Sequence, residues 1–360
     1  MRIKNNLKYL AGIVCFLILV LFSQYSNIHA ETSLTQNDKG QYCIKSADDF
    51  ITFLKDENKT FRNKEQVSVI LNNDISISDP PKTSAFIFKG TFDGNGKTIS
   101  FTKSRFNNIN ESLFPFFLYG KIKNVKIDVD CTIYNGDLNN STANIIFRSI
   151  SKATLQGITI RGNVKCIIND NQKFLAVSAS DAIKSSTKFE DCEFSLDYKL
   201  ENDNLTELAQ CMKTNNFLIE LYQIGGRSSN TATFQNCFSN AVLDNSIITL
   251  YDKLNEEGFA NNIKQSGIYI QYINAYASKF LNYYYNKETY PNIELLSVPA
   301  QALVTNKERK PSDIDSAGRT TSEMKSKNTY VGFDFDKKWS ISDKKNNGYP
   351  YYDPRVEEIT

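Results

Sequence analysis

Four acidic residues have the spacing that acid–base or calcium chemistry would need. Asp128 and Asp130 lie two positions apart in a strand-like run, so their side chains point to the same side. If that side faces outward, the pair could bind calcium, or act as acid and base with Asp191 or Glu193 from a neighbouring part of the chain. The competing interpretation, which we favour, is that these residues are solvated surface charges.

A tyrosine-rich stretch offers a second kind of site. Tyrosine rings on a flat sheet can pack against sugar rings or a protein partner while the hydroxyl group stays in water. Because neighbours in a strand alternate, Tyr283 and Tyr285 share one side and Tyr284 takes the other, so only one set can be exposed. Tyr283 and Tyr285 are the candidate ligand-binding residues, unless the rings cover the core instead. The stretch comprises Tyr269, Tyr272, Tyr276, Tyr283, Tyr284, Tyr285 and Tyr290.

The scarcity of histidine excludes most familiar catalytic machinery. The one histidine is His29, just before the expected cleavage site of a signal peptide, so a processed chain would have none. Ser-His-Asp and Cys-His catalysis and HExxH zinc sites would then be excluded. The 42 basic and 40 acidic residues give a net charge of +2, which does not indicate a nucleic-acid partner. We expect no cofactor, with calcium left open.

The first 30 residues have the layout of a secretory signal peptide. Arg2, Lys4 and Lys8 precede the apolar run 10–22, and Ala30 ends the segment. We therefore expect a secreted or surface-displayed chain with no membrane span after cleavage; an uncleaved anchor is the alternative. The cysteines after residue 30 are widely spaced and contain no CxxC, so we interpret most of them as small buried apolar residues and leave disulfides open. They are Cys43, Cys131, Cys166, Cys192, Cys211 and Cys237.

One short helix is predicted near the start of the expected domain. Ser46 followed by an acid three residues later indicates a helix N-terminus, and Asn58 and Lys59 are expected to end the helix. Its apolar residues fall on one face: Phe50, Phe53 and Leu54. The sequence then turns to short strands, and residues 93–96 (Asp-Gly-Asn-Gly) indicate a tight turn.

A repeated pattern of an apolar residue, any residue, Asn, Asp or Gly, and another apolar residue predicts a solenoid. Its copies are spaced by 33, 34, 45 and 46 residues, so we expect loop insertions, the largest at 199–216 and 251–265. In a parallel β-helix the leading residues would form one ladder, and the Asn/Asp/Gly column would suit a bend in left-handed backbone. An all-β sandwich is the alternative. The leading residues are Ile122, Leu155, Phe189, Phe234 and Phe280.

Both ends of this region resemble bacterial GLUG-motif surface proteins. The likeness rests on residues 88–99 and 113–127, on the helix start at 46–50, and on the closing residues 319–353. It implies an extracellular right-handed parallel β-helix of the pectate-lyase-like kind, often part of adhesin-like proteins. The glycine-rich repeats that name the motif are poorly kept, and no peptidase motif is present.

These observations predict an all-β right-handed parallel β-helix with a short N-terminal capping helix. We expect a signal peptide at 1–30, the β-helix at 31–304 with its cap at about 43–60, a polar linker at 305–318, and a closing segment at 319–360.

The function that we expect is non-catalytic: binding of a glycan or an extracellular protein along one solenoid face by a monomer. A β-helix enzyme, either a polysaccharide lyase or an acid-only glycoside hydrolase, is the alternative, and a structural spacer is a third. Convergence of three or more acids in a groove would favour the enzyme.

Overall fold

The computed structural model describes residues 34–81, 86–106, 111–138, 142–169, 175–180, 183–184, 186–215, 218–225, 232–255, 267–273, 279–289 and 316–353. The chain forms two compact units, 1–35 and 36–360, and all the described helices and strands belong to the second. The predicted signal peptide lies outside the described residues, as do Tyr276, Tyr290 and most of the predicted linker.

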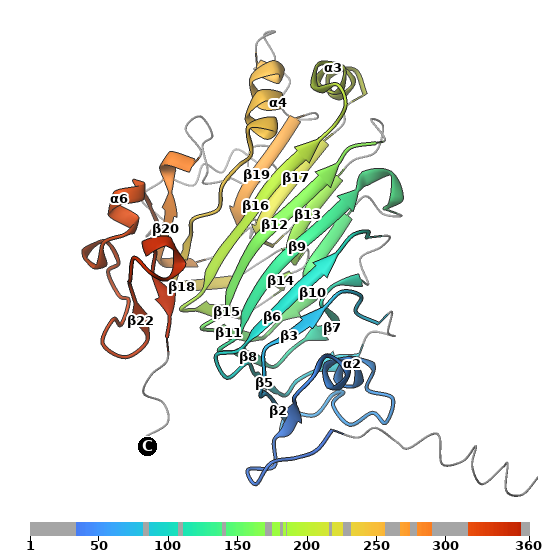
Figure 1. Cartoon of the computed structure of the whole chain (residues 1–360), viewed down its shortest axis with the longest axis vertical. Coiled ribbons are helices and arrows are strands. Elements are labelled where there is room, and N and C mark those ends of the chain that lie inside the picture. Colours follow the sequence, from blue (N-terminus) through green and yellow to red (C-terminus); the bar gives the residue numbers. More distant parts are fainter. Residues whose placement is uncertain are drawn as a thin grey trace, which may run out of the picture. The chain divides into compact units, whose positions relative to one another are not determined.

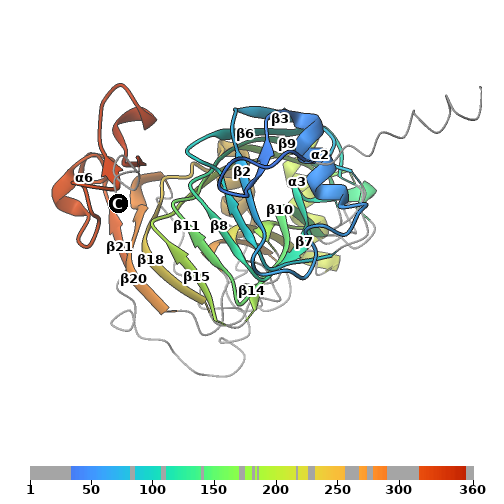
Figure 2. The ribbon, with the colours of Figure 1, turned by 90° about the horizontal axis from the view of Figure 1, so that it is seen from below.

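The second unit is a right-handed parallel β-helix with three faces (Figures 1 and 2). Every strand pair along these faces is parallel, which excludes the sandwich alternative. The first face contains β1 (Tyr42–Ile44), β2 (Ser68–Leu71), β5 (Thr91–Asp93), β8 (Lys121–Lys123), β11 (Thr154–Gln156), β15 (Thr187–Glu190) and the first halves of β18 (Ala232–Ser239) and β20 (Lys279–Asn286).

The second face contains β3 (Ile75–Ile77), β6 (Thr98–Lys103), β9 (Lys126–Tyr134), β12 (Thr159–Ile167) and β16 (Glu193–Glu201), with the end of β18 beside β16 and β21 (Ser316–Arg319) beside β20. The third face contains β4 (Ile87–Phe88), β7 (Phe114–Leu118), β10 (Thr142–Ser151), β13 (Leu175–Ser180), β17 (Leu218–Ile224) and β19 (Gly267–Ile273), and the short β14 (Ile183–Lys184) pairs with β10.

The predicted core ladder is confirmed. Ile122, Leu155, Phe189 and Phe234 are paired in register on successive strands, and all four are fully buried. Phe280 continues the register on β20. The rings of Phe189 and Phe234 stack 4.6 Å apart, because directly paired residues of neighbouring parallel strands point the same way.

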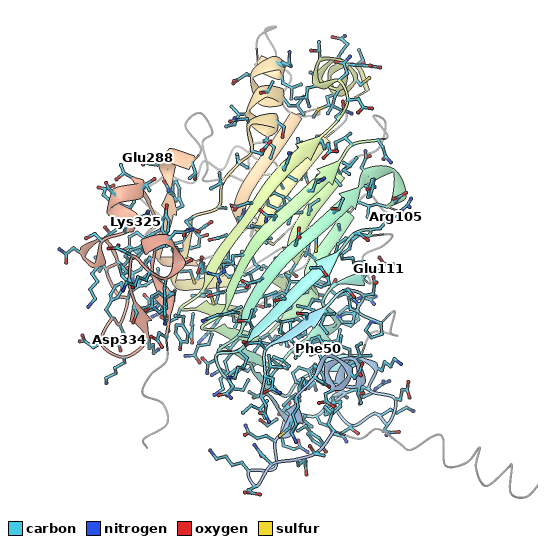
Figure 3. All side chains as sticks on the ribbon, in the orientation of Figure 1. Phe50, Arg105, Glu111, Glu288, Lys325 and Asp334 are labelled. Atoms are coloured by element: carbon cyan, nitrogen blue, oxygen red, sulfur yellow. The ribbon has the colours of Figure 1, made fainter. Side chains whose placement is uncertain are left out.

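The predicted capping helix is also confirmed, as α2 (Ala47–Lys55). The Ser46 side chain accepts a hydrogen bond from the Asp49 amide at 3.1 Å. Phe50, labelled in Figure 3, makes edge contacts with rings of the first coils, so the helix covers the apolar interior that the end of the solenoid would expose. The helix ends at Lys55, earlier than expected, because Asp56 takes left-handed backbone and its amide bonds to the Thr52 carbonyl.

Two helices occupy loops between coils. α3 (Leu205–Asn215) lies within the first predicted insertion, and α4 (Asn245–Asn255) begins before the second, most of which lies outside the described residues. Single 3-10 turns occur at Asn135–Asp137, Lys287–Thr289, Lys327–Thr329 and Asn346–Gly348.

The residues after β21 form a compact C-terminal segment, residues 320–353. It contains α6 (Thr321–Met324) and the antiparallel pair β22 (Trp339–Ser340) and β23 (Tyr351–Tyr352). We expected these residues to close the end of the solenoid, but they lie along one flank and contact several successive coils (Figures 1 and 2). Among the described residues, no helix is long and apolar enough to cross a membrane.

Candidate functional site

The C-terminal segment docks on a column of left-handed residues where the first face bends into the second. Positive φ angles at five stacked positions confirm the predicted column: Asn124, Gly157, Asp191, Asn236 and Asn282. Their side chains hydrogen-bond along the column, with Asn282 Nδ2 donating to Asn236 Oδ1 at 3.0 Å and Asn236 Nδ2 donating to Asp191 Oδ1 at 3.2 Å. We call this column the asparagine ladder.

The ladder has a gap at Gly157, and the ring of Tyr352 fills it. A Cβ atom at Gly157 would lie 2.2 Å from Tyr352 Cε1, so only glycine leaves room for the ring. Further along the ladder, Gly332 packs in the same way against the side-chain amide of Asn282. The segment therefore fits the ladder through close backbone approach at two separate positions.

An aromatic cluster completes this contact. From the solenoid come Phe238 of β18 and Tyr284 of β20, and the Tyr284 hydroxyl accepts a hydrogen bond from the Val331 amide at 3.0 Å. Their partners in the segment are Met324, Tyr330, Phe333, Trp339, Tyr349 and Tyr352. Burial of this many large side chains indicates a stable structural contact.

Asp191, one of the predicted acids, belongs to this contact. Its carboxylate is almost fully buried, accepts from Lys338 Nζ at 3.0 Å and lies 3.4 Å from Trp339 Nε1. Both partners belong to the C-terminal segment, so this carboxylate is already neutralised and hydrogen-bonded. It is not free to act on a substrate.

Glu193 and Asp128 lie on either side of Arg161 on the outer side of the second face. Arg161 Nε donates to Asp128 Oδ1 at 2.9 Å, and Arg161 Nη1 donates to Asn346 Oδ1 at 3.2 Å. Asn346 Nδ2 in turn lies 3.4 Å from Glu193 Oε2. The cluster joins β9, β12 and β16 to the C-terminal segment.

Burial raises the pKa of Glu193 to about 7, although the charge of Arg161 and the Asn346 side chain act to lower it. Glu193 Oε1 accepts no hydrogen bond of ordinary geometry from the described residues, although the nearby Ser195 hydroxyl also acts to lower the pKa. A buried carboxyl with a pKa near neutrality is a known feature of general acids. A raised pKa is also expected for a carboxyl group that is buried because the C-terminal segment covers it.

Of the four predicted acids, Asp128 and Glu193 come together on either side of Arg161, and the four do not converge in one group. Asp130 is exposed on β9, Asp128 pairs with Arg161, and Asp191 faces Lys338. No group of three His, Cys, Asp or Glu residues that could hold a metal ion occurs in the described ranges. The geometry that the enzyme alternative required is therefore not present among these residues.

The predicted ligand-binding tyrosines point inward. Tyr283 is 2% exposed, and its ring packs edge-on against Phe234 of the core ladder. Tyr285 is half-buried, and burial raises its pKa. Tyr284, on the outer side, is covered by the C-terminal segment. Tyr283 therefore offers no surface to a ligand, because its side of β20 faces the core.

A surface that the sequence analysis missed lies where the third face turns into the first. Four stacked segments there, residues 86–92, 113–123, 144–156 and 183–189, carry seven Lys or Arg residues and no Asp or Glu. Lys123 pairs with Asp93 at the margin of the area. We call the rest the basic corner: the cations Lys89, Lys121, Arg148, Lys152, Lys184 and Lys188, with the apolar side chains Ile87, Phe117 and Tyr119.

None of these six cations forms an ion pair with another described residue. The guanidinium of Arg148 lies 4.9 Å from the ring centre of Phe117, which is the geometry of a cation–π contact. Partial burial lowers the pKa of Arg148, and no carboxylate from the described ranges opposes this effect. Ile87 and Tyr119 are among the few large apolar side chains that the described surface exposes.

The cysteines and the wider comparisons add no further site. The six described cysteines are free thiols, and all but Cys211 are buried, as the sequence interpretation expected. No protein-family model matches the chain, and no curated protein matches it either. The likeness to GLUG-motif proteins therefore stays a prediction.

One similar solved structure comes from Bacteroides ovatus and carries the name "putative immunoglobulin A1 protease". It is 14% identical, with a TM-score of 0.41 over 88% of this chain and 93% of that one. At this level the likeness carries no argument. The fold and the side chains define a class, a parallel β-helix with a C-terminal segment docked on its flank and a basic corner whose cations pair with no acid in the described ranges.

Proposed function

We propose that this chain is an exported, non-catalytic binding protein that holds a glycan or an extracellular protein at its basic corner. One observation carries the proposal: Arg148 is partly buried against Phe117 and has no counter-ion among the described residues. Partial desolvation of a cation carries a cost that an approaching anion offsets. An external ligand would supply that anion.

The rest of the described surface supports this choice of site. Arg62, Arg105, Arg161 and Lys338 all lie within 3.0 Å of a carboxylate of the same chain. The basic corner instead combines unpaired cations with exposed apolar side chains, a composition that is typical of binding surfaces.

A binding screen with matched surface variants tests the proposal. The whole chain is applied to immobilised glycans and extracellular-matrix proteins beside the double variant Ile87→Ser, Tyr119→Ser. Val331→Ser is the control, because Val331 is an exposed apolar residue in the C-terminal segment. We expect the double variant to lose binding about tenfold and the control to bind like wild type.

A reducing-sugar assay on every glycan that binds completes the screen. We expect no release of sugar ends. Release of sugar ends, or binding that survives the double variant, would contradict the proposal.

A further inference from the structure

We infer that the ligand of the basic corner is an anionic polysaccharide, a polymer that carries carboxylate or sulfate groups between its hydroxyl groups. This inference rests on the proposed function and names the ligand class for the same site. The inference follows from the order of side chains along the corner, from the side chains that surround Arg148, and from the spacing of the cations.

Hydroxyl and ammonium groups alternate along one row of the first face. The residues that point outward from successive strands are paired in register: Thr91, Lys121, Thr154, Lys188 and Thr233. Because neighbouring strands lie about 4.8 Å apart, Lys121 and Lys188 are separated by roughly 10 Å, with the Thr154 hydroxyl between them. A chain of sugars that bears hydroxyl groups between anionic groups can bond to such a row along its length.

Arg148 and the apolar side chains lie beside this row. Lys152 is exposed in left-handed backbone at the bend between β10 and β11, so it extends the positive charge from Arg148 toward Lys188. A guanidinium binds a carboxylate or sulfate through two parallel hydrogen bonds. The exposed ring of Tyr119 can pack on the C–H face of a sugar. The site thus offers charge, hydroxyl groups and a ring on one edge of the solenoid.

Spacing argues against the other polyanions. Duplex DNA carries one charge for each ~1.7 Å of its axis, whereas the row offers a cation only at every second strand, roughly every 10 Å. An acidic peptide that adds as a strand would need free backbone groups, but β8, β11 and β15 are paired on both sides. Anionic lipid would present a plane of charge, whereas the cations of the basic corner gather along one edge of the solenoid, where the third face turns into the first. Asp93 and Glu190 border it on the side of the asparagine ladder.

Equilibrium binding to defined polymers tests the inference. Heparin and polygalacturonate are the anionic probes, and dextran is the neutral one. The triple variant Lys121→Gln, Lys152→Gln, Lys188→Gln is compared with Lys126→Gln, Lys165→Gln, Lys199→Gln, which removes the same charge from the second face. We expect the first triple to weaken heparin binding by about tenfold or more at roughly 0.15 M salt, and the second by less than about twofold.

The other outcomes separate the two levels of the proposal. Duplex DNA or phosphatidylserine vesicles could bind as tightly as heparin, or dextran or a protein could bind in a way that the first triple weakens. Either outcome would overturn the assignment of an anionic polysaccharide as the ligand and leave the corner as the binding site. If the two triples weaken binding equally, or if no probe binds, then both the ligand class and the site are wrong.

Discussion

The asparagine ladder and the basic corner lie on opposite edges of the first face, and they use the same β-helix geometry in opposite ways. Along the ladder, each stacked polar group meets a partner within the chain: the next amide, Lys338, or the ring of Tyr352. Along the corner, the stacked cations have no intramolecular acid among the described residues.

The difference distinguishes polar side chains that are bonded within the fold from polar side chains that are available to a ligand. A parallel β-helix repeats whatever a position carries at every coil, so it builds rows of like groups on both edges. Where a later segment covers the row, its groups stabilise the fold. Where no described segment covers such a row, as at the basic corner, the row is available to a ligand. Four variants can break or sharpen this contrast.

Gly157→Asn should have the largest effect on the protein itself. Asparagine would tolerate the left-handed backbone, but its Cβ would expel the ring of Tyr352 from the ladder. Loss of one buried aromatic contact costs about 4 kcal/mol, so the C-terminal segment should detach while the coils stay folded. Limited trypsin digestion should then cut at Lys325 and Lys337 faster than it does in wild type.

Gly96→Asn is the matched control for this variant. Gly96 has a similar φ of 70° but nothing within 4 Å of its Cβ position. If Gly157→Asn resists trypsin as well as Gly96→Asn does, the ladder is not what holds the segment.

Glu193→Gln should remove a pH-dependent change of about 3 kcal/mol in the free energy of unfolding. In the unfolded chain this carboxyl has a pKa near 4.5, and in the folded chain about 7. Between these values the folded state keeps a proton that the unfolded state has lost, so wild-type stability should fall by about 3 kcal/mol as the pH rises from 4.5 to 7, and stay level outside that window.

Urea unfolding at pH 4.5 and at pH 7.5 measures this fall. The glutamine variant should be the more stable protein at pH 7.5 and equal to wild type at pH 4.5. Asp130→Asn, which removes an exposed carboxylate from the same face, controls for net charge. Identical pH profiles for wild type and Glu193→Gln would contradict the burial of a titrating carboxyl under the C-terminal segment.

Asp191→Asn should have a smaller effect and destabilise the docking of the C-terminal segment on the solenoid by about 1–2 kcal/mol. Asparagine keeps the left-handed backbone and the ladder but loses the charge that faces Lys338 at 3.0 Å. Amide hydrogen exchange over β22 and β23 reports the change. In a double-mutant cycle with Lys338→Gln, a coupling energy near zero would show that the ion pair adds nothing.

The corner variants should have the smallest effect on stability. The triple variant Lys121→Gln, Lys152→Gln, Lys188→Gln removes charges that have no acidic partner in the part of the chain that the structure describes. The free energy of unfolding should therefore change by less than about 0.5 kcal/mol. A rise in the free energy of unfolding by more than about 0.5 kcal/mol would indicate that the lysine charges of the corner repel one another in wild type. A clear loss would indicate that these lysines stabilise the fold and are not held free for a ligand.

The sequence was sufficient for everything that a periodic pattern encodes. Repeat spacing and local backbone preference predict three features: the core ladder from Ile122 to Phe234, the asparagine ladder with its left-handed residues Asn124 and Asn236, and the capping helix with Phe50. That Asp128 and Asp130 share one side follows from strand alternation in the same way, and the structure places that side outward.

What the sequence could not supply was the partner of each outward residue. The Lys338–Asp191 pair joins residues 147 positions apart, and no local signal indicates that the C-terminal segment returns to the flank. The side of β20 that faces the core is not encoded in three consecutive tyrosines, so the sequence left Tyr283 open between a ligand-binding surface and the core. The basic corner did leave a trace, because an acid-free stretch leads into each of the core-ladder residues Ile122, Leu155 and Phe189.

The most direct test of the contrast is a lysine-acetylation footprint of the wild-type chain with heparin or dextran present. Heparin should protect Lys89, Lys121, Lys152, Lys184 and Lys188, while Lys126, Lys165 and Lys199 on the second face react as they do with dextran. Protection on the second face, or equal protection of all these lysines, would contradict the account, because the unpaired corner would then not be the binding surface.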